Sequence, residues 1–145
     1  MEIIKGGVTA AKGFEAASAA AGIKYQDRTD MALIYSEKPC KTAGTFTTNV
    51  VKAAPVKWDK AIVESGIKSQ VVIVNSGIAN ACTGEEGYGY CRETANAAAK
   101  ALGVKACLLY TSNRKKCAGA AAEAGERGCQ AGMRGGRAGK TYDDL

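Results

Sequence analysis

Hydrophobic and polar positions along the first two thirds of the chain follow the strand and helix spacings of an α/β domain. Residues 31–36 (MALIYS) predict a strand, a turn is expected at Pro39, and residues 42–47 (TAGTFT) predict a second strand. Residues 70–75 (QVVIVN) predict a further strand. Its uninterrupted aliphatic run indicates an inner strand whose two faces are both covered in the complete protein.

Residues 57–65 have the apolar spacing of a short amphipathic helix. Trp58, Ala61 and Ile62 are expected on its buried face, and Gly66 follows in the position where glycine commonly ends a helix. A short helix between two strands fits the alternation of elements in an α/β domain.

A longer helix is predicted further along the chain. Thr83 and Glu86 have the spacing of a capping box, in which each side chain bonds an unpaired backbone amide at the helix start. Gly103 is expected to end the helix. Because Gly87 and Gly89 disfavour helix, the first turn is expected to be irregular or to begin later. The residues expected on the buried face are Tyr88, Cys91, Ala95, Ala98 and Leu102.

The alternation of strands and helices ends near Ala106, because few large apolar residues follow Leu109. A segment with so little to bury cannot offset the conformational entropy that ordering costs. We therefore predict that residues 1–106 form an N-terminal α/β part of the chain. Residues 107–145 are predicted to form a Gly/Ala/Arg-rich tail that is disordered or artefactual.

The junction between these two parts has an unusual sequence. Residues 107–112 (CLLYTS) are what the transposon-end adapter of a sequencing library would encode. One hypothesis is that the reading frame passes here from a gene into adapter and then into foreign sequence. The alternative is a natural strand over residues 106–110.

Composition and charge narrow the class of protein. The chain has 145 residues, is 46% hydrophobic and carries a formal net charge of +6, which suits one domain with a real core. Its basic excess indicates a solvated surface, because neither interleaved aromatic residues nor a nucleic-acid-binding motif accompanies it. No apolar run approaches the roughly 20 residues of a membrane helix, and the start lacks a signal-peptide pattern. We expect a cytoplasmic protein without nucleic-acid or membrane partners.

Histidine is absent from the sequence, which excludes Ser–His and Cys–His nucleophile pairs and the commonest zinc ligand. The six cysteines show no C-x-x-C spacing and no secretion signal accompanies them, so free and mostly buried thiols are expected. The sequence gives no reason to expect a cofactor or a metal site.

Three sequence motifs occur along the chain in the order that is typical of one protein family. They are GVTAAKGF at residues 7–14, GTFTTN at residues 44–49 with VKAAPV at residues 51–56, and NSGIANACTG at residues 75–84. Together they resemble the ornithine acetyltransferase family, also called bifunctional glutamate N-acetyltransferase. The resemblance covers about residues 3–106 and identifies the chain as an N-terminal fragment. Ala11 and Ile78 depart from the proline and asparagine that are usual in the family.

The resemblance implies the layered α/β fold of that family and acetyl transfer from N-acetylornithine to glutamate in arginine biosynthesis. Family members cleave themselves before a threonine, whose new N-terminal amine serves as base for its own hydroxyl. A Thr-Gly pair within a Ser-Thr-Gly stretch stabilises the oxyanion. The partners implied are the two small-molecule substrates and the missing C-terminal chain.

The catalytic residues of the family have no counterpart in this sequence. Where the Ser-Thr-Gly stretch is expected, residues 110–113 read YTSN, so the oxyanion role is not carried onto Thr111. No catalytic, substrate-binding or metal-binding residue is therefore assigned. The fragment is expected to be an acyltransferase by resemblance and inactive on its own.

Residues 75–84 are expected to form a strand-to-helix loop at the C-terminal edge of a sheet, where α/β proteins commonly bind ligands. Their Asn and Thr side chains are candidates to line a pocket for a polar, amino-acid-sized substrate. The alternative, favoured for any single residue, is that these side chains only cap the helix and bond nearby backbone. Thr83 in particular has a sufficient role as a cap.

A different class of function also remains open. The chain is alternatively a non-catalytic binding or interaction domain that carries a basic, disordered tail. Binding of a ligand without turnover would distinguish it from a truncated enzyme, and strongly salt-dependent binding would indicate a nucleic-acid arm.

Overall fold

The computed structural model describes residues 6–79, 81–105 and the backbone of 109–110. The elements in chain order are η1 (Val8–Ala10), β1 (Phe14–Ala19), β2 (Met31–Cys40), α1 (Ala54–Glu64), β3 (Ser69–Asn75), α2 (Gly84–Leu102) and β4 (Leu109–Tyr110). Four strands form one sheet in the order β1-β2-β3-β4. β1 and β3 both pair with β2 in antiparallel orientation, whereas β4 pairs with β3 in parallel orientation. The predicted α/β class is confirmed.

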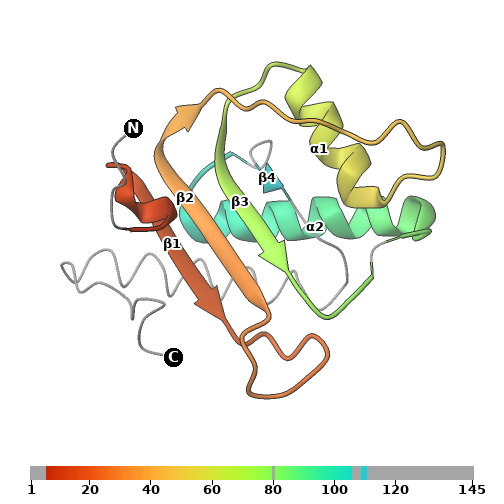
Figure 1. Ribbon diagram of the computed structural model, residues 1–145, viewed down its shortest axis with the longest axis horizontal. Helices are drawn as coiled ribbons and strands as arrows, with labels where there is room; N and C mark the ends of the chain where they lie inside the picture. Colours follow the sequence, from red (N-terminus) through yellow and green to blue (C-terminus); the bar gives the residue numbers. More distant parts are fainter. Residues whose placement is uncertain (1–5, 80, 106–108, 111–145) are drawn as a thin grey trace.

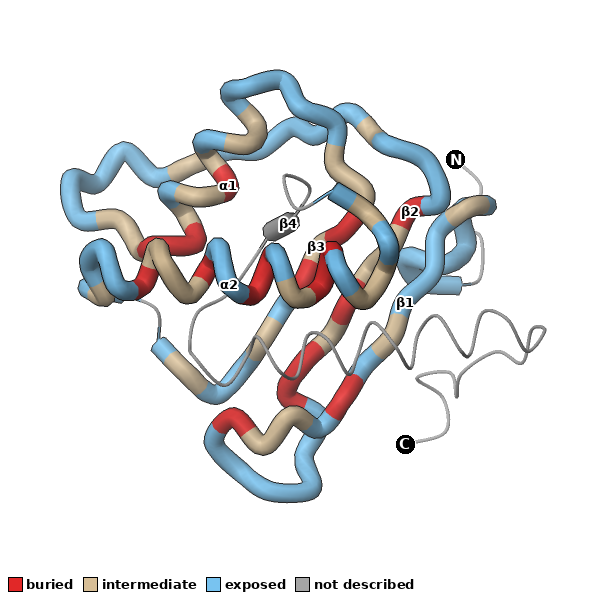
Figure 2. The backbone as a smooth tube through the Cα atoms, turned by 180° about the vertical axis from the view of Figure 1, so that it is seen from behind, coloured by how far each residue is buried: buried red, intermediate tan, exposed pale blue. Residues whose placement is uncertain are grey.

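The core lies between α2 and one face of the sheet (Figure 1). Alternate residues of β2 and β3 point to this face, as the two-residue period of a strand requires. The helix presents small side chains to them, which lets its backbone approach the strands closely. Figure 2 shows the buried positions gathered where α2 crosses β2 and β3. The buried cluster comprises Ile23, Met31, Leu33, Val71, Ile73, Ala95, Ala98 and Ala99.

The predicted strand over residues 70–75 is confirmed as β3, and β3 is an inner strand between β2 and β4. The two faces of β3 differ in how far their side chains are buried. Val71 is only 1% exposed beneath α2, whereas Val74, on the opposite face, is 45% exposed. Val74 pairs with Ala32, and Val72 pairs with Ile34, so apolar side chains from two strands share this second face. The described residues therefore cover the sheet fully on one side only.

The predicted turn at Pro39 and the strand predicted over residues 42–47 are both wrong. β2 continues through Pro39 to Cys40, and residues 41–53 form no helix or strand. A register irregularity between Tyr35 and Cys40 interrupts the pairing with β3, which is where a proline without an N–H is tolerated. Residues 42–47 are almost all exposed and pair with no strand. Their β-branched composition alone does not make a strand without an edge to join.

The predicted helix over residues 57–65 is confirmed as α1, but α1 starts three residues earlier, at Ala54. Pro55 in the first turn explains the early start, because its fixed φ suits a helix and its missing N–H needs no partner there. Gly66 ends the helix as predicted, with φ of +68°. The prediction for Ala61 is wrong, since this residue is exposed. The helix buries Ala54, Pro55 and Asp59, with Trp58 and Ile62 half-buried.

The predicted long helix is confirmed as α2, and it ends at Gly103 in the left-handed conformation, with φ of +67°. Cys91, Ala95 and Ala98 are fully buried as expected, and Tyr88 and Leu102 are half-buried. Although α2 has 19 residues, no helix in the described ranges is long and apolar enough to cross a bilayer.

The capping box predicted at the start of α2 is not formed. Thr83 is the N-cap residue, but its side chain makes no cap hydrogen bond. Its ψ of 0° is helical, whereas a capping side chain usually needs an extended residue to reach back to the amides. Glu86 instead accepts a hydrogen bond from the hydroxyl of Tyr90, one turn further on. The glycines do not delay the helix, which begins at Gly84.

The three cysteines in the described ranges, Cys40, Cys82 and Cys91, are free thiols, as expected. Only Cys91 is buried, so the expectation of mostly buried thiols is wrong for these three. Cys107, Cys117 and Cys129 lie outside the described residues, as do the predicted tail and most of its junction. Leu109 and Tyr110 form β4, which agrees with the natural-strand alternative at those two positions.

The carboxyl group of Asp59 is buried on α1. Asp59 is 6% exposed, and its Oδ1 has no hydrogen-bond partner among the described residues. Loss of hydration disfavours the charged form, which raises the pKa of Asp59 from 3.8 to about 7. Near it, Trp58 of α1 meets Tyr88 of α2 edge to face, with ring centroids 5.4 Å apart. The buried side of α1 therefore contains one carboxyl group whose pKa lies near neutral pH.

Replacing Val71 and Val74 by threonine tests the one-sided cover of β3. Val71→Thr buries a hydroxyl in the core and should lower the free energy of unfolding by about 1–3 kcal/mol. Val74→Thr should change it by less than about 0.5 kcal/mol while reducing the binding of a hydrophobic dye. Urea unfolding and dye fluorescence measure the two effects. Equal losses of stability in the two variants would contradict the assignment of faces.

Asp59→Asn should change the dependence of stability on pH. Because the folded protein holds the Asp59 proton more tightly than the unfolded chain does, its contribution to stability is greatest below pH 3.8 and falls as pH rises to about 7. The variant should therefore be about 1–3 kcal/mol more stable than the native chain at pH 8 and similar to it at pH 4. Urea unfolding at both pH values measures this. Glu64→Gln, which removes an exposed carboxylate from the same helix, is the control and should not reproduce the gain in stability at pH 8.

Candidate functional site

Two loops meet at one end of the sheet. One joins β1 to β2 over residues 20–30, and the other joins β3 to α2 over residues 76–83. β2 pairs with both β1 and β3, and Met31 at its start lies opposite both Ala19 and Asn75. This shared register brings the loops together, although more than 40 residues separate them in the sequence. The predicted strand-to-helix loop is thus confirmed at the C-terminal end of β3.

Asp30 anchors both loops. Its Oδ1 accepts a hydrogen bond from the amide of Ala21, and its Oδ2 accepts one from the amide of Ile23, each at 2.7 Å. Its carbonyl oxygen accepts a hydrogen bond from the amide of Ser76 at 2.8 Å, and its own amide donates to the carbonyl of Ala19 at 3.2 Å. Asp30 is only 8% exposed, and these bonds compensate for the burial of its charge.

Gly77 allows the close approach of the two loops. Its φ is +91°, a conformation that residues with a side chain rarely adopt. A Cβ atom at this position would lie 3.2 Å from the Cβ of Lys24, closer than ordinary van der Waals contact. A side chain at Gly77 would therefore strain the backbone and push the loops apart.

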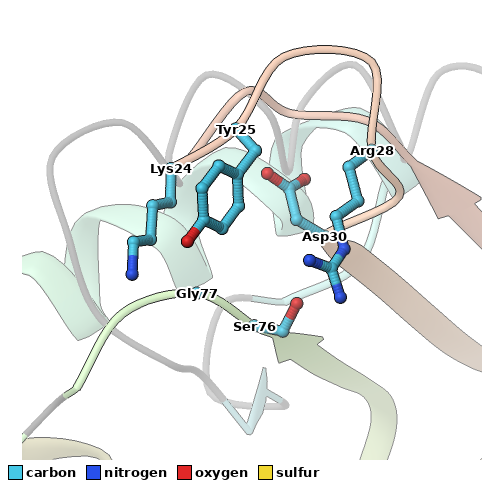
Figure 3. A pocket seen from close by; sticks show the side chains of 6 residues that line it. All are labelled: Lys24, Tyr25, Arg28, Asp30, Ser76 and Gly77. Carbon is cyan, nitrogen blue, oxygen red and sulfur yellow. The ribbon is translucent and has the colours of Figure 1, made fainter.

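The two loops form a cavity of about 130 Å³ that opens to solvent, lined by Lys24, Tyr25, Arg28, Asp30, Ser76 and Gly77. Figure 3 shows Lys24 and Arg28 on either side of the Tyr25 ring, with Asp30 between the ring and Arg28. Lys24 Nζ lies 5.1 Å from the ring centroid and Arg28 Cζ lies 5.8 Å from it, both within cation–π range. The cavity combines two positive groups at its rim with one buried carboxylate.

The sequence located the loop but not the residues that line its cavity. From residues 75–84, Ser76 and Gly77 line the cavity, whereas Asn75 and Thr83 do not. Asn80 lies outside the described residues. Lys24, Tyr25, Arg28 and Asp30 were not predicted. Their only signal in the sequence is an acidic residue directly before a strand, following a short segment rich in charge.

The residues that line the cavity suit it to binding charged groups. The sequence contains no histidine, the residue that most often activates a serine such as Ser76. In the ranges that the structure describes, no three potential metal ligands of the His, Cys, Asp or Glu type come together. Asp59, whose pKa is raised to about 7, is not among the residues that line the cavity.

Comparison with known proteins relates the sequence to one family. A model of the ArgJ family matches residues 15–113. Over 105 residues the chain is 51% identical to the arginine biosynthesis bifunctional protein ArgJ of Gloeobacter violaceus, which covers 72% of this chain and 26% of that protein. Over 111 residues it is 50% identical to the protein of the same name from Symbiobacterium thermophilum, covering 75% and 27%. The chain thus spans about a quarter of the length of these curated relatives.

Solved structures with the same fold include two members of this group. The fold matches ornithine acetyltransferase from Mycobacterium tuberculosis, crystallised with ornithine, with a TM-score of 0.75 and 38% identity over 83% of this chain and 69% of that chain. It matches the arginine biosynthesis bifunctional protein of Bacillus halodurans with a TM-score of 0.73 and 31% identity, over 81% and 66%. The layered α/β fold that the motifs implied is therefore confirmed.

Asp30→Asn tests the anchor of the site. The asparagine NH₂ group cannot accept a hydrogen bond, so either the amide of Ala21 or that of Ile23 loses its partner. The free energy of unfolding should fall by about 1–3 kcal/mol, and these two amides should exchange faster with solvent. Urea unfolding and amide exchange measure both effects.

Asp27→Asn is the matched control, because Asp27 lies in the same loop but is exposed. Asparagine is tolerated at its φ of +55°. The free energy of unfolding of the Asp27→Asn variant should stay within about 0.5 kcal/mol of that of the native chain. Equal losses in the two variants would show that Asp30 is not the anchor.

Proposed function

The chain belongs to the ArgJ family, and we propose that it forms the N-terminal part of a cytoplasmic acyltransferase of arginine biosynthesis. The proposed reaction is transfer of an acetyl group from N-acetylornithine to glutamate. The observation that carries the proposal is the family match over residues 15–113. The fold similarity to an ornithine acetyltransferase crystallised with ornithine supports it independently.

The proposed chemistry suits a sequence without histidine. In the family, the attacking hydroxyl belongs to a threonine whose own N-terminal amine acts as the base, so no imidazole is needed. Neither this threonine nor the Thr-Gly oxyanion pair has been found in the sequence. We therefore propose that the chain on its own transfers no acetyl group. In the complete enzyme, we propose that it gives structural support to catalytic residues from the rest of the protein.

Residues 1–106 are the segment to which we assign this role. The family match continues to Asn113, beyond that boundary. We keep the proposal that an artefactual or poorly ordered tail begins near residue 107. Resequencing the source DNA across the codon for Ala106 is the direct check on that boundary.

A chimera with a relative tests the function. Residues 15–105 of this chain would replace the corresponding segment of the Gloeobacter violaceus protein, to which the chain is 51% identical. We expect the chimera to form ornithine from N-acetylornithine and glutamate at a rate within about tenfold of the parent, because the parent retains every residue that does the chemistry. The isolated chain should show no turnover above a buffer blank.

The parent enzyme and the chimera carrying Asp30→Asn are the controls. The variant chimera should lose thermal stability before it loses its ability to process the substrates, since Asp30 supports the fold. A chimera that folds and self-cleaves but transfers no acetyl group would contradict the proposal. Such a result would favour a non-catalytic binding domain instead.

A further inference from the structure

We propose that the cavity between the β1–β2 and β3–α2 loops binds a small zwitterion, a molecule that carries a carboxylate and an ammonium group a few bonds apart. The inference goes beyond acetyl transfer and does not depend on it. It follows from the charges that line the cavity, from their hydrogen-bond partners and from the size of the space.

The rim of the cavity carries two positive charges, and neither forms an ion pair with a carboxylate of the described residues, although Asp30 lines the same cavity. Among the described residues the ion pair of the fold is Lys60 with Glu64 on α1, and neither Lys24 nor Arg28 forms one. Both cations instead lie near the ring of Tyr25, which restrains them beside the opening. A guanidinium group presents paired N–H donors that match the two oxygens of a carboxylate. The rim is therefore complementary to one carboxylate group.

The inner wall of the cavity selects for an ammonium group on the same ligand. Asp30 lines the cavity, and each of its carboxylate oxygens accepts one backbone amide. An ionised carboxylate offers about four acceptor sites, so each oxygen keeps a further lone pair. A ligand that brought only negative charge, such as phosphate, would gain at the rim but be repelled by Asp30. A zwitterion satisfies both signs.

The small size of the cavity favours a compact ligand. Its volume of about 130 Å³ is below the roughly 300–1,000 Å³ of sites for drug-sized molecules. Gly77 and Lys24 already approach closely across it, which leaves little room for the loops to close further. Amino acids with small side chains, such as glycine and alanine, have the charges and the dimensions required.

Saturation-transfer NMR on the full chain tests the proposal, with glycine, acetate and methylammonium as separate probes. Inorganic phosphate, which has no carbon-bound protons to observe, is added as a competitor that displaces the glycine signal. This measurement works even if the chain associates. We expect glycine to bind with millimolar affinity and at least about tenfold more tightly than acetate, methylammonium or phosphate, since only glycine engages both the rim and Asp30. The comparison of glycine with acetate tests Asp30 without altering a residue that the fold needs.

Substitutions at the rim test the location. Lys24→Gln with Arg28→Gln should weaken glycine binding by about tenfold or more. Lys60→Gln, which removes a lysine of α1 outside the cavity, is the matched control and should bind glycine as the native chain does. Absence of a glycine signal, equal binding of glycine and acetate, tighter binding of phosphate, or binding unchanged by the double substitution would each overturn the proposal.

Discussion

The end of the sheet that carries the candidate site depends on one buried carboxylate. Asp30 is the last residue before β2, and its side chain holds the preceding loop through the amides of Ala21 and Ile23. Its main chain holds the start of the following loop through the amide of Ser76. A buried charge is tolerated only when hydrogen bonds compensate for its lost hydration. The carboxylate therefore needs the loop amides as donors, and the loop needs the carboxylate to hold its conformation. The cavity forms because the hydrogen bonds of Asp30 hold the β1–β2 loop and the start of the β3–α2 loop together, although the two loops are distant in sequence.

The second constraint is the small size of the side chains that α2 presents to the sheet. Ala95, Ala98 and Ala99 let the helix lie close to Val71 and Ile73, and a larger residue at these positions would lift it away. Among the described residues, this is the covered face of β3. On the other face, Val74 remains exposed beside residues of β2. Apolar surface of this kind on a sheet is normally covered by further structure.

Much of the fold could be predicted from the sequence, because the relevant signals are local. The aliphatic run of β3, the helical spacing of α2 and the glycine at Gly103 each specify structure within a few residues. β1 was missed because residues 14–19 (FEAASA) show little apolar alternation, and the strand is defined by its partner β2. The strand predicted over residues 42–47 failed for the converse reason, since it has strand-like residues but no partner.

The cavity could not be predicted from the sequence, because its two halves meet through strand register rather than through a motif. The motif at residues 75–84 located one half, and nothing in the sequence linked Lys24 or Arg28 to it.

The proposed function gives a reason for the uncovered face of the sheet. The chain spans about a quarter of its curated relatives, so three quarters of their length has no counterpart here. If that remainder packs on the face bearing Val74, hydrophobic burial would place the relatives' catalytic residues relative to the sheet. Enzymes require such residues to be held to a fraction of an ångström, which a sheet fixed on both faces can provide. On this view, the exposed Val74 marks the face of the sheet against which the rest of the relatives' length would pack.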